Sequence, residues 1–166
     1  EVENVTLDNI RLRVPGGGSR ELAQREIPEL PAAYPEHVMF GDLPAYGLFC
    51  RHVKNLKLRN VELSVAKRDD RPALWCQAVE GVDLDAVACV GPSEARSVVV
   101  FHNVRDAFIH GCRSPRLPGS WLEVSGEESA GIALRTNDFS RAARDVDLPK
   151  SGPGARVVDD GRDRRE

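Results

Sequence analysis

A repeat of 25 or 26 residues constrains this chain more than any other feature. The run 47–63 reads GLFCRHVKNLKLRNVEL, and the run 73–89 reads ALWCQAVEGVDLDAVAC. A third copy from Val98 reads VVVFHNVRDAFIHGCRS, a weaker fourth copy ends in GIALRTND, and the opening VTLDNIRL resembles the second half of an earlier copy. The matched positions include Cys50 with Cys76, Leu58 with Leu84, Leu84 with Ile109, and Ile109 with Leu134. Self-similarity at this period indicates stacked copies of one unit.

Each copy has the alternation of β-strands. A strand in which apolar and polar residues alternate is followed by Val and two polar residues. A second, short strand then has apolar residues two apart. The corners hold Asn9, Asn60 and Gly111, residue types that tolerate a left-handed backbone. About 25 residues with several short strands is the length of one coil of a parallel β-helix. A β-sandwich would not keep the same internal offsets through three copies, so we predict an all-β solenoid of about five coils.

The strand pattern also predicts which side chains form the core. Leu48, Cys50, Leu74, Cys76, Val99 and Phe101 should point inward, and Phe49, Trp75 and Val100 outward. Stacked aliphatic columns explain how a chain with only 5% aromatic residues can fold. Trp121, at the start of the fourth copy, is predicted to belong to the core or to a cap.

Composition excludes several classes of partner. The net charge is −3, so no broad basic field attracts nucleic acid or an anionic membrane. No apolar run approaches the roughly 18 residues of a membrane helix. The histidines lack the spacing of a zinc site, and no acidic calcium motif occurs, so we expect neither metal nor cofactor. The four cysteines form no CxxC motif. Cys50 and Cys76 should lie on adjacent rungs within disulfide reach, but their parallel side chains favour two buried thiols.

The predicted β-helix spans residues 1–149. One segment interrupts its repeats, and a second segment follows them. Residues 15–46 form a long insertion with three consecutive glycines and five prolines, and one helical turn capped by Ser19 is expected there. The insertion is interpreted either as a lid over an exposed coil or as a ligand-binding loop. Residues 150–166 form a charged tail, in which a strand around 155–158 can cap the last coil.

The residues also resemble a known family. The stretches VENVTLDNIRLRVPGGG, IPELPAAYPEHVMFGDLPAYGLFCRHVKNLKLRNVEL and DDRPALWCQAVEGVDLDAV are similar to the C-terminal half of bacterial family-28 glycoside hydrolases, which include polygalacturonases. The resemblance covers residues 2 to 140. It implies a right-handed parallel β-helix, here its C-terminal coils, and inverting, metal-independent hydrolysis of uronate-containing, pectin-like polysaccharide. Inversion requires an acid and a base about 6.5–9.5 Å apart.

The family's catalytic motifs are not convincingly present. They are Asn-Thr-Asp, Asp-Asp, Gly-His-Gly and Arg-Ile-Lys on successive coils. Asp69-Asp70, His110-Gly111, Thr136-Asn137-Asp138 and Asp159-Asp160 occur in the wrong order or context, and we interpret them as turn and surface residues. No catalytic residue is therefore assigned. The chain starts at Glu1 rather than Met, and we expect a fragment that is inactive alone, with the catalytic coils preceding Glu1.

Several residues are candidates for contact with the polysaccharide. They lie in the insertion or on the outward columns beside it: Tyr34, Glu36, Phe40, Tyr46, Arg51, His52 and Trp75. Arg51 can hold a uronate carboxylate through a bidentate fork or pair with a nearby Glu. Trp75 and Phe49 can stack on sugar rings, or the insertion can cover them.

Alternatives to the hydrolase remain open at this stage. One is a non-catalytic carbohydrate-binding or structural β-solenoid, and a weaker one is a β-helical lyase. The resemblance implies a secreted or periplasmic protein. An uncapped first coil would expose a β edge, so association through that edge is also expected.

Overall fold

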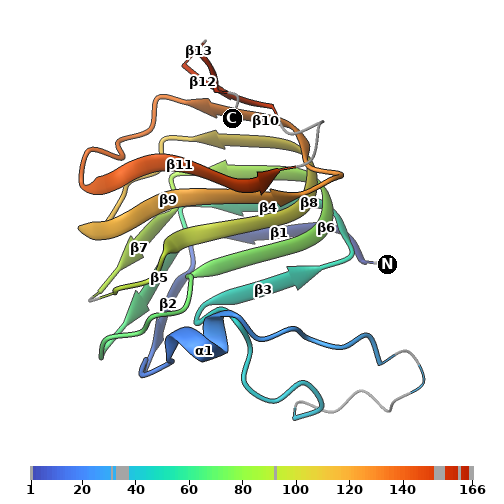
Figure 1. Ribbon diagram of the computed structural model, residues 1–166, viewed down its shortest axis with the longest axis vertical. Coiled ribbons are helices and arrows are strands. Elements are labelled where there is room, and N and C mark those ends of the chain that lie inside the picture. The colour runs from blue at the N-terminus through green and yellow to red at the C-terminus, as the bar shows by residue number, and fades with distance from the viewer. Residues whose placement is uncertain are drawn as a thin grey trace.

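The computed structural model is an all-β solenoid of about four turns with parallel strands (Figure 1). It describes residues 2–30, 32, 38–91, 93–151, 156–160 and 162–164. Each turn contributes to three faces, which we call face one, face two and face three. Strands β6 (Leu74–Asp85) and β8 (Ser97–His110) are long because each bends from face one into face two.

Face one carries the first strand of every repeat. Its parallel neighbours are β3 (Leu48–Arg51), the first parts of β6 and β8, β9 (Leu117–Gly126) and β11 (Ala142–Ser151). Cys50 pairs with Cys76, and Cys76 pairs with Phe101, in agreement with the predicted repeat.

Face two carries the second strand. It runs through β1 (Val2–Asp8), β4 (Val53–Arg59), the second parts of β6 and β8, β10 (Ala130–Arg135) and β12 (Val157–Asp159). Strand β12 is the C-terminal strand expected around residues 155–158. Strand β13 (Arg162–Arg164) pairs with β12 in an antiparallel hairpin. Face three is shorter and consists of β2 (Arg11–Val14), β5 (Glu62–Val65) and β7 (Ala88–Val90).

The bends between faces use left-handed backbone at stacked positions. Asn9, Asn60 and Gly111, predicted as corner residues, have φ angles of 58°, 50° and 63°. The Asn60 amide donates to the side-chain oxygen of Asn9 at 2.6 Å, which links two rungs of this column. Asparagine suits the position because its short polar side chain tolerates this backbone region.

The interior is a continuous aliphatic core. Leu58, Leu84, Ile109 and Leu134 are paired on successive rungs of face two and are fully buried. Cys76, Val99 and Phe101 are equally buried on face one, as predicted. Trp121 is also a core residue, stacked on Phe139 with 4.3 Å between ring centroids.

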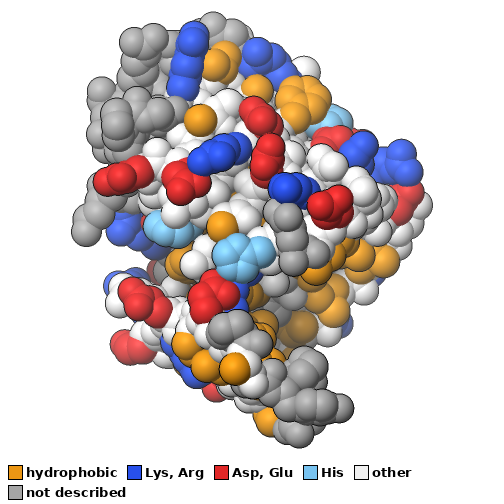
Figure 2. Space-filling view, turned by 90° about the vertical axis from the view of Figure 1, so that its right-hand side faces the viewer, with side chains coloured by type: hydrophobic (Ala, Val, Ile, Leu, Met, Phe, Trp, Pro, Cys, Tyr) orange, Lys and Arg blue, Asp and Glu red, His pale blue; other side chains and the backbone are white. Residues whose placement is uncertain are grey.

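The two ends of the solenoid differ. At the N-terminal end, β1, β2 and β3 each have a described strand on one side only. Val5 and Leu12 are therefore half-buried, whereas their counterparts Leu56 and Leu63 are buried. Figure 2 shows hydrophobic side chains gathered toward this lower end. Association through the open edge stays a prediction.

The insertion lies beside the same end. After β2 it forms the short helix α1 (Arg20–Ala23) with Ser19 as N-cap, as expected, and it returns to face one at β3. Figure 1 shows α1 and the neighbouring described parts of the insertion below β3, next to face one. The connection from face three to face one is thus the place where this chain adds material to its solenoid.

Candidate functional site

The floor of the candidate site is one outward column of face one. Pairing between strands places Phe49, Trp75, Val100, Glu123 and Asp147 on five successive rungs. Neighbouring rungs of a sheet are about 4.8 Å apart, so the column runs along the solenoid axis for about 19 Å. It passes from aromatic through aliphatic to acidic side chains.

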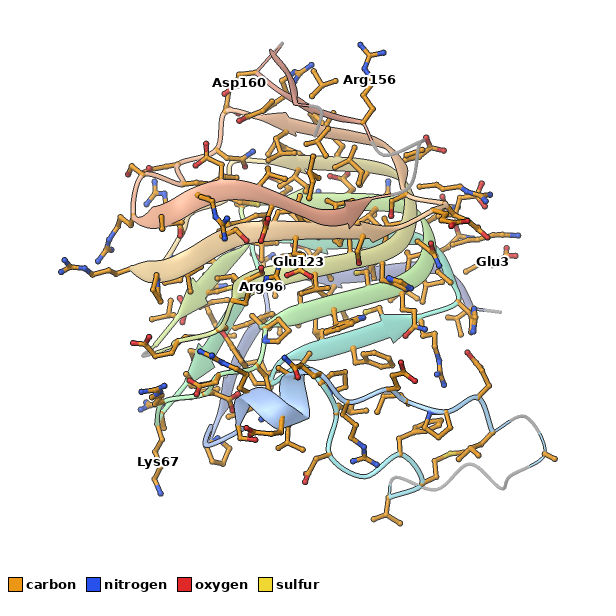
Figure 3. All side chains as sticks on the ribbon, viewed as in Figure 1. Glu3, Lys67, Arg96, Glu123, Arg156 and Asp160 are labelled. Atoms are coloured by element: carbon orange, nitrogen blue, oxygen red, sulfur yellow. The ribbon has the colours of Figure 1, made fainter. Side chains whose placement is uncertain are left out.

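A hollow of about 730 Å³ lies over the middle and acidic part of this column. Its floor includes Trp75, Val100 and Glu123. Helix α1 supplies Arg20 on one side, and Arg144 of β11 lies on the other. Figure 3 labels Arg96 and Glu123 close together on the front of the solenoid, above α1. We call this space the charged hollow.

Arginines and carboxylates form a network in the charged hollow. Arg96 contacts Glu123 at 3.4 Å and Asp147 at 3.2 Å, and Arg144 contacts Asp147 at 3.3 Å. The two carboxylate side chains are 18% and 15% exposed, whereas both arginine side chains are more than half exposed. Ser97 donates to Glu123 at 3.1 Å. The carboxylates thus fix the guanidinium groups from below and leave them open to solvent.

A second hollow of about 330 Å³ adjoins the first and shares Trp75 and Gln24 with it. Most of its wall is uncharged: Ile27, Pro44, Phe49, Trp75, Gln77 and His102 line it together with Arg25 and Glu26. His102 contacts the Ser125 hydroxyl through Nδ1 at 3.1 Å, which fixes its ring. We call this space the neutral hollow. The indole N–H of Trp75, between the hollows, is buried without an acceptor among the described residues.

Arg51, a predicted ligand of the sugar, is instead engaged by the insertion. It donates to the carbonyl oxygens of Ile27 at 2.8 Å and Pro28 at 3.3 Å, and it contacts Glu29 at 3.4 Å. Its guanidinium lies over the rings of Phe40 and Phe49, 5.5 and 5.8 Å from their centroids. Only 11% of the side chain is exposed. Of the two roles considered for Arg51, pairing with a nearby Glu is the one found.

His52 occupies a left-handed corner, with φ of 55°. Its Nε2 contacts the Glu29 carboxylate at 2.8 Å, and this hydrogen bond lowers the pKa of Glu29. Both side chains are more than half exposed. His52 therefore holds the insertion at its outer edge, next to Arg51.

The other predicted contacts are distributed differently. Phe40 packs on Arg51, and Trp75 lies between the two hollows. Tyr46 packs against the core, and burial raises the pKa of its hydroxyl. Tyr34 and Glu36 lie outside the described residues. Trp75 is thus the predicted contact that lines both hollows.

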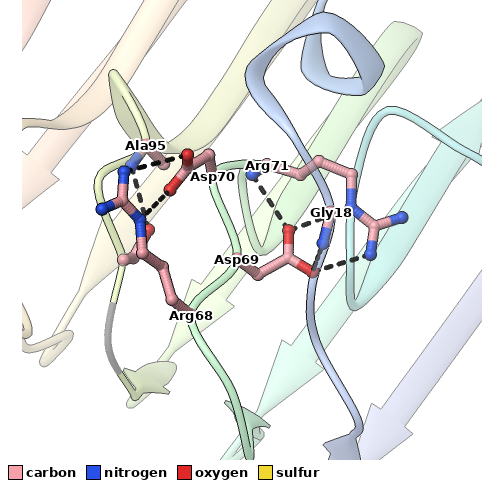
Figure 4. Close-up of polar contacts among 7 residues, drawn as sticks. Gly18, Arg68, Asp69, Asp70, Arg71 and Ala95 are labelled. Atoms are coloured by element: carbon pink, nitrogen blue, oxygen red, sulfur yellow. Dashed lines mark hydrogen bonds and ion pairs between the residues drawn. The ribbon is translucent and has the colours of Figure 1, made fainter.

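The interpretation of Asp69 as a surface residue is wrong. Asp69 is fully buried and accepts hydrogen bonds from the Gly18 N–H at 2.9 Å and from Arg71 Nη2 at 2.8 Å (Figure 4). Arg71 also donates to the Leu43 carbonyl at 3.1 Å. Asp69 and Arg71 therefore tie the two ends of the insertion, at Gly18 and Leu43, to the connection between β5 and β6. Asp70 instead forms an ion pair with Arg68.

The remaining carboxylate and histidine motifs have structural contacts. His110 lies on face two with its ring nitrogens 3.0 Å from Asp83 and 3.5 Å from Asp85. Asn137 donates to the Ile109 carbonyl and accepts from the Cys112 N–H, which joins two corners. Among the described ranges, no group of three or more His, Cys, Asp or Glu side chains is arranged to hold a metal ion.

The cysteines are free thiols in the structure. A hydrogen bond with Cys76 lowers the pKa of the partly exposed Cys50 thiol. Burial raises the pKa of Cys89, and it raises that of Cys112 to about 12. In the part of the chain that is described, no helix has the length and apolar character needed to cross a membrane.

Sequence reasoning missed the charged hollow. On face one the fourth rung is offset by 23 residues, since Val99 pairs with Leu122, whereas face two keeps the offset of 25. Glu123 was therefore not aligned with Val100 and Trp75. The signal in the sequence is the shorter offset within the fourth copy. A search for such a second offset would have aligned Glu123 with Val100.

Comparison with known proteins assigns no family. Neither family models, nor curated proteins, nor solved structures match this chain. The site therefore has to be interpreted from its own chemistry.

Proposed function

We propose that this chain forms the C-terminal coils of a pectin-type, polygalacturonase-like glycoside hydrolase and supplies one wall of its polysaccharide groove. The observation that carries the proposal is the charged hollow, where Arg96 and Arg144 stand exposed above an aromatic and aliphatic floor. Guanidinium groups bind carboxylates through paired, charge-assisted hydrogen bonds. An indole such as Trp75 offers an apolar surface to a sugar ring.

The network explains why preorganised arginines suit an acidic sugar. Glu123 and Asp147 restrict the guanidinium groups before a ligand arrives, which lowers the entropy lost on binding. The same carboxylates can accept hydrogen bonds from sugar hydroxyls. A uronate-containing polysaccharide presents both a carboxylate and hydroxyls, and it matches this set of groups.

The open N-terminal end supports a position after other coils. The half-buried Val5 and Leu12 continue columns that are buried on every later rung, and among the described strands β1 and β2 each have a partner on one side only. A preceding coil of the same solenoid type would cover both the apolar column and the edges. The resemblance places the catalytic carboxylates in such coils, and it implies inversion, independence of metal and an exported enzyme.

The alternative is a non-catalytic carbohydrate-binding solenoid. It is favoured by the ion pairs themselves, because Glu123 and Asp147 are each engaged by arginine in a contact within the chain. Coils with Asn-Thr-Asp and Asp-Asp motifs encoded ahead of Glu1 would support the hydrolase, and a different upstream sequence would support this alternative.

Calorimetric titration with oligogalacturonate tests the binding proposal. We expect binding by the wild-type chain and a loss of about tenfold or more in affinity for the double variant Arg96→Ala/Arg144→Ala. The matched control is Arg13→Ala/Arg113→Ala, which removes the same charge from face three. No release of reducing ends is expected from this chain alone. Equal affinities of the two double variants would overturn the assignment of the charged hollow.

A further inference from the structure

A third hollow, of about 570 Å³, adjoins the charged hollow and shares Glu94 and Pro118 with it. It lies over the turns that lead from face three to face one, where β9 and β11 begin. Three arginines line it: Arg68, Arg116 and Arg141. We call this space the arginine hollow.

Charges on neighbouring rungs of face two alternate in sign. Strand pairing forms two such columns, Glu3, Lys54, Glu80 and Arg105 in one, and Asp8, Arg59 and Asp85 in the other. Opposite charges on adjacent strands attract, whereas like charges placed side by side destabilise the sheet. On face one, Glu123 and Asp147 are a like-charged pair, but Arg96 contacts both carboxylates and supplies the opposite charge.

Arg116 and Arg141 are a like-charged pair of the other sign. They directly precede Leu117 and Ala142, which pair between β9 and β11, so they lie on neighbouring rungs about 4.8 Å apart. Both residues are exposed. Neither guanidinium forms an ion pair or hydrogen bond with another described residue, whereas that of Arg68 is held by Asp70 at 2.9 Å.

Two carboxylates lie near this pair without bridging it. Glu94 lines the arginine hollow but forms no ion pair with either Arg116 or Arg141. Asp138 lies outside the hollow; hydrogen bonds from Ser140 lower its pKa, and the charges of Arg113 and Arg141 lower it further. The like-charged pair in the arginine hollow therefore lacks the counter-charge that Arg96 provides in the charged hollow.

We propose that Arg116 and Arg141 bind a second carboxylate of the polysaccharide whose first carboxylate meets Arg96 and Arg144. This inference rests on the proposed function and extends its groove from the charged hollow, past Pro118, into the arginine hollow. Two adjacent guanidinium groups hold a carboxylate through charge-assisted hydrogen bonds, and the bound anion offsets their mutual repulsion. The ligand is thus an acidic polymer that fills both hollows.

Calorimetric titration with hexagalacturonate tests the inference. The double variant Arg116→Gln/Arg141→Gln keeps side-chain length and hydrogen-bonding capacity but removes both charges. We expect its affinity to fall about tenfold below that of the wild type. The matched control, Arg13→Gln/Arg113→Gln, removes the same charge from face three and should bind as the wild type does.

Thermal unfolding without ligand separates binding from a structural role. Removing a like-charged pair relieves repulsion, so Arg116→Gln/Arg141→Gln should melt at or above the temperature of the wild type. A melting temperature below that of the control variant would mean that the two arginines support the fold, and it would overturn the inference.

The outcomes also separate this inference from the proposed function. If Arg96→Ala/Arg144→Ala weakens hexagalacturonate binding and Arg116→Gln/Arg141→Gln does not, the inference is overturned and the proposed function stands. If only Arg116→Gln/Arg141→Gln weakens it, the groove shared by the two hollows is overturned together with the assignment of the charged hollow. Absence of binding by the wild type would overturn both proposals.

Discussion

Replacing the buried Asp69 tests whether the insertion is tied to the solenoid by one ion pair. Asp69→Ala removes four hydrogen bonds to the carboxylate, from the Gly18 N–H, the Arg71 N–H, Arg71 Nε and Arg71 Nη2. Breaking a buried ion pair from one side costs about 3–5 kcal/mol. The Arg71 side chain is 15% exposed and keeps its bond to Leu43, so we expect about 3 kcal/mol.

Urea unfolding followed by tryptophan fluorescence measures this free energy. The control is the neighbouring variant Asp70→Ala. The partner of Asp70, Arg68, is 61% exposed, so this variant should lose less than about 1 kcal/mol of unfolding free energy. Asp69→Asn keeps an acceptor but loses the charge, so its loss in free energy of unfolding should lie between those of Asp69→Ala and Asp70→Ala. Equal losses for Asp69→Ala and Asp70→Ala would refute the tether.

The pH dependence of Asp69→Asn gives a second test of the same pair. Burial alone would raise the pKa of Asp69, but hydrogen bonds from Arg71 and the Gly18 N–H outweigh it and leave the pKa below its ordinary value. A folded-state pKa that is depressed contributes stability above the unfolded pKa of about 3.9, and this stability is lost as pH falls below it. The wild type should therefore lose more stability than Asp69→Asn on acidification below about pH 4, with no difference in slope at neutral pH. Parallel pH curves in the acid range would contradict the argument.

Further substitutions test the exposure, corners and strand faces of the solenoid. A thiol-specific chromogenic reagent should label Cys50 first in the native protein, because the other three thiols are buried, and Cys50→Ser should abolish the fast phase. Asn60→Val should cost about 1–3 kcal/mol in urea unfolding, because a β-branched residue is strained at φ of 50°, whereas Asn60→Gly should cost clearly less. Leu58→Ala should cost about 2–5 kcal/mol by the same measurement, against about 0.5 kcal/mol or less for the exposed neighbour Lys57 replaced by Ala. Similar losses at Leu58 and Lys57 would contradict the assigned strand faces.

Much of the solenoid could be predicted from the sequence because stacking repeats one environment. The offsets of 26 and 25 residues predicted the pairing of Cys50 with Cys76 and of Leu84 with Ile109. The corner residue Asn60 was predicted from its tolerance of the left-handed backbone. These features are local or periodic, and periodic features are visible in a single sequence.

The insertion could not be predicted in the same way. Arg51 and Arg71 are bound by backbone carbonyl oxygens of Ile27 and Leu43, and a carbonyl leaves no trace in residue identity. Asp69 was misread because a charged residue in a turn is usually exposed, whereas here a returning loop buries it. The charged hollow was missed because the shorter offset on face one moves Glu123 into a column that the repeat does not reveal.

The floor and the wall of the groove therefore have different physical origins. The floor follows from stacking, because outward residues of successive rungs must form a column about 4.8 Å apart whatever their identity. The wall follows from the insertion, which two arginines anchor, Arg51 at the Ile27 carbonyl and Arg71 at the Leu43 carbonyl. Changes in the insertion can alter which sugar unit fits beside Trp75 without disturbing the aliphatic core. Asp69→Ala frees Gly18 from the carboxylate and leaves Arg71 held by Leu43 alone, so it should weaken oligosaccharide binding even though Asp69 lines neither hollow beside Trp75.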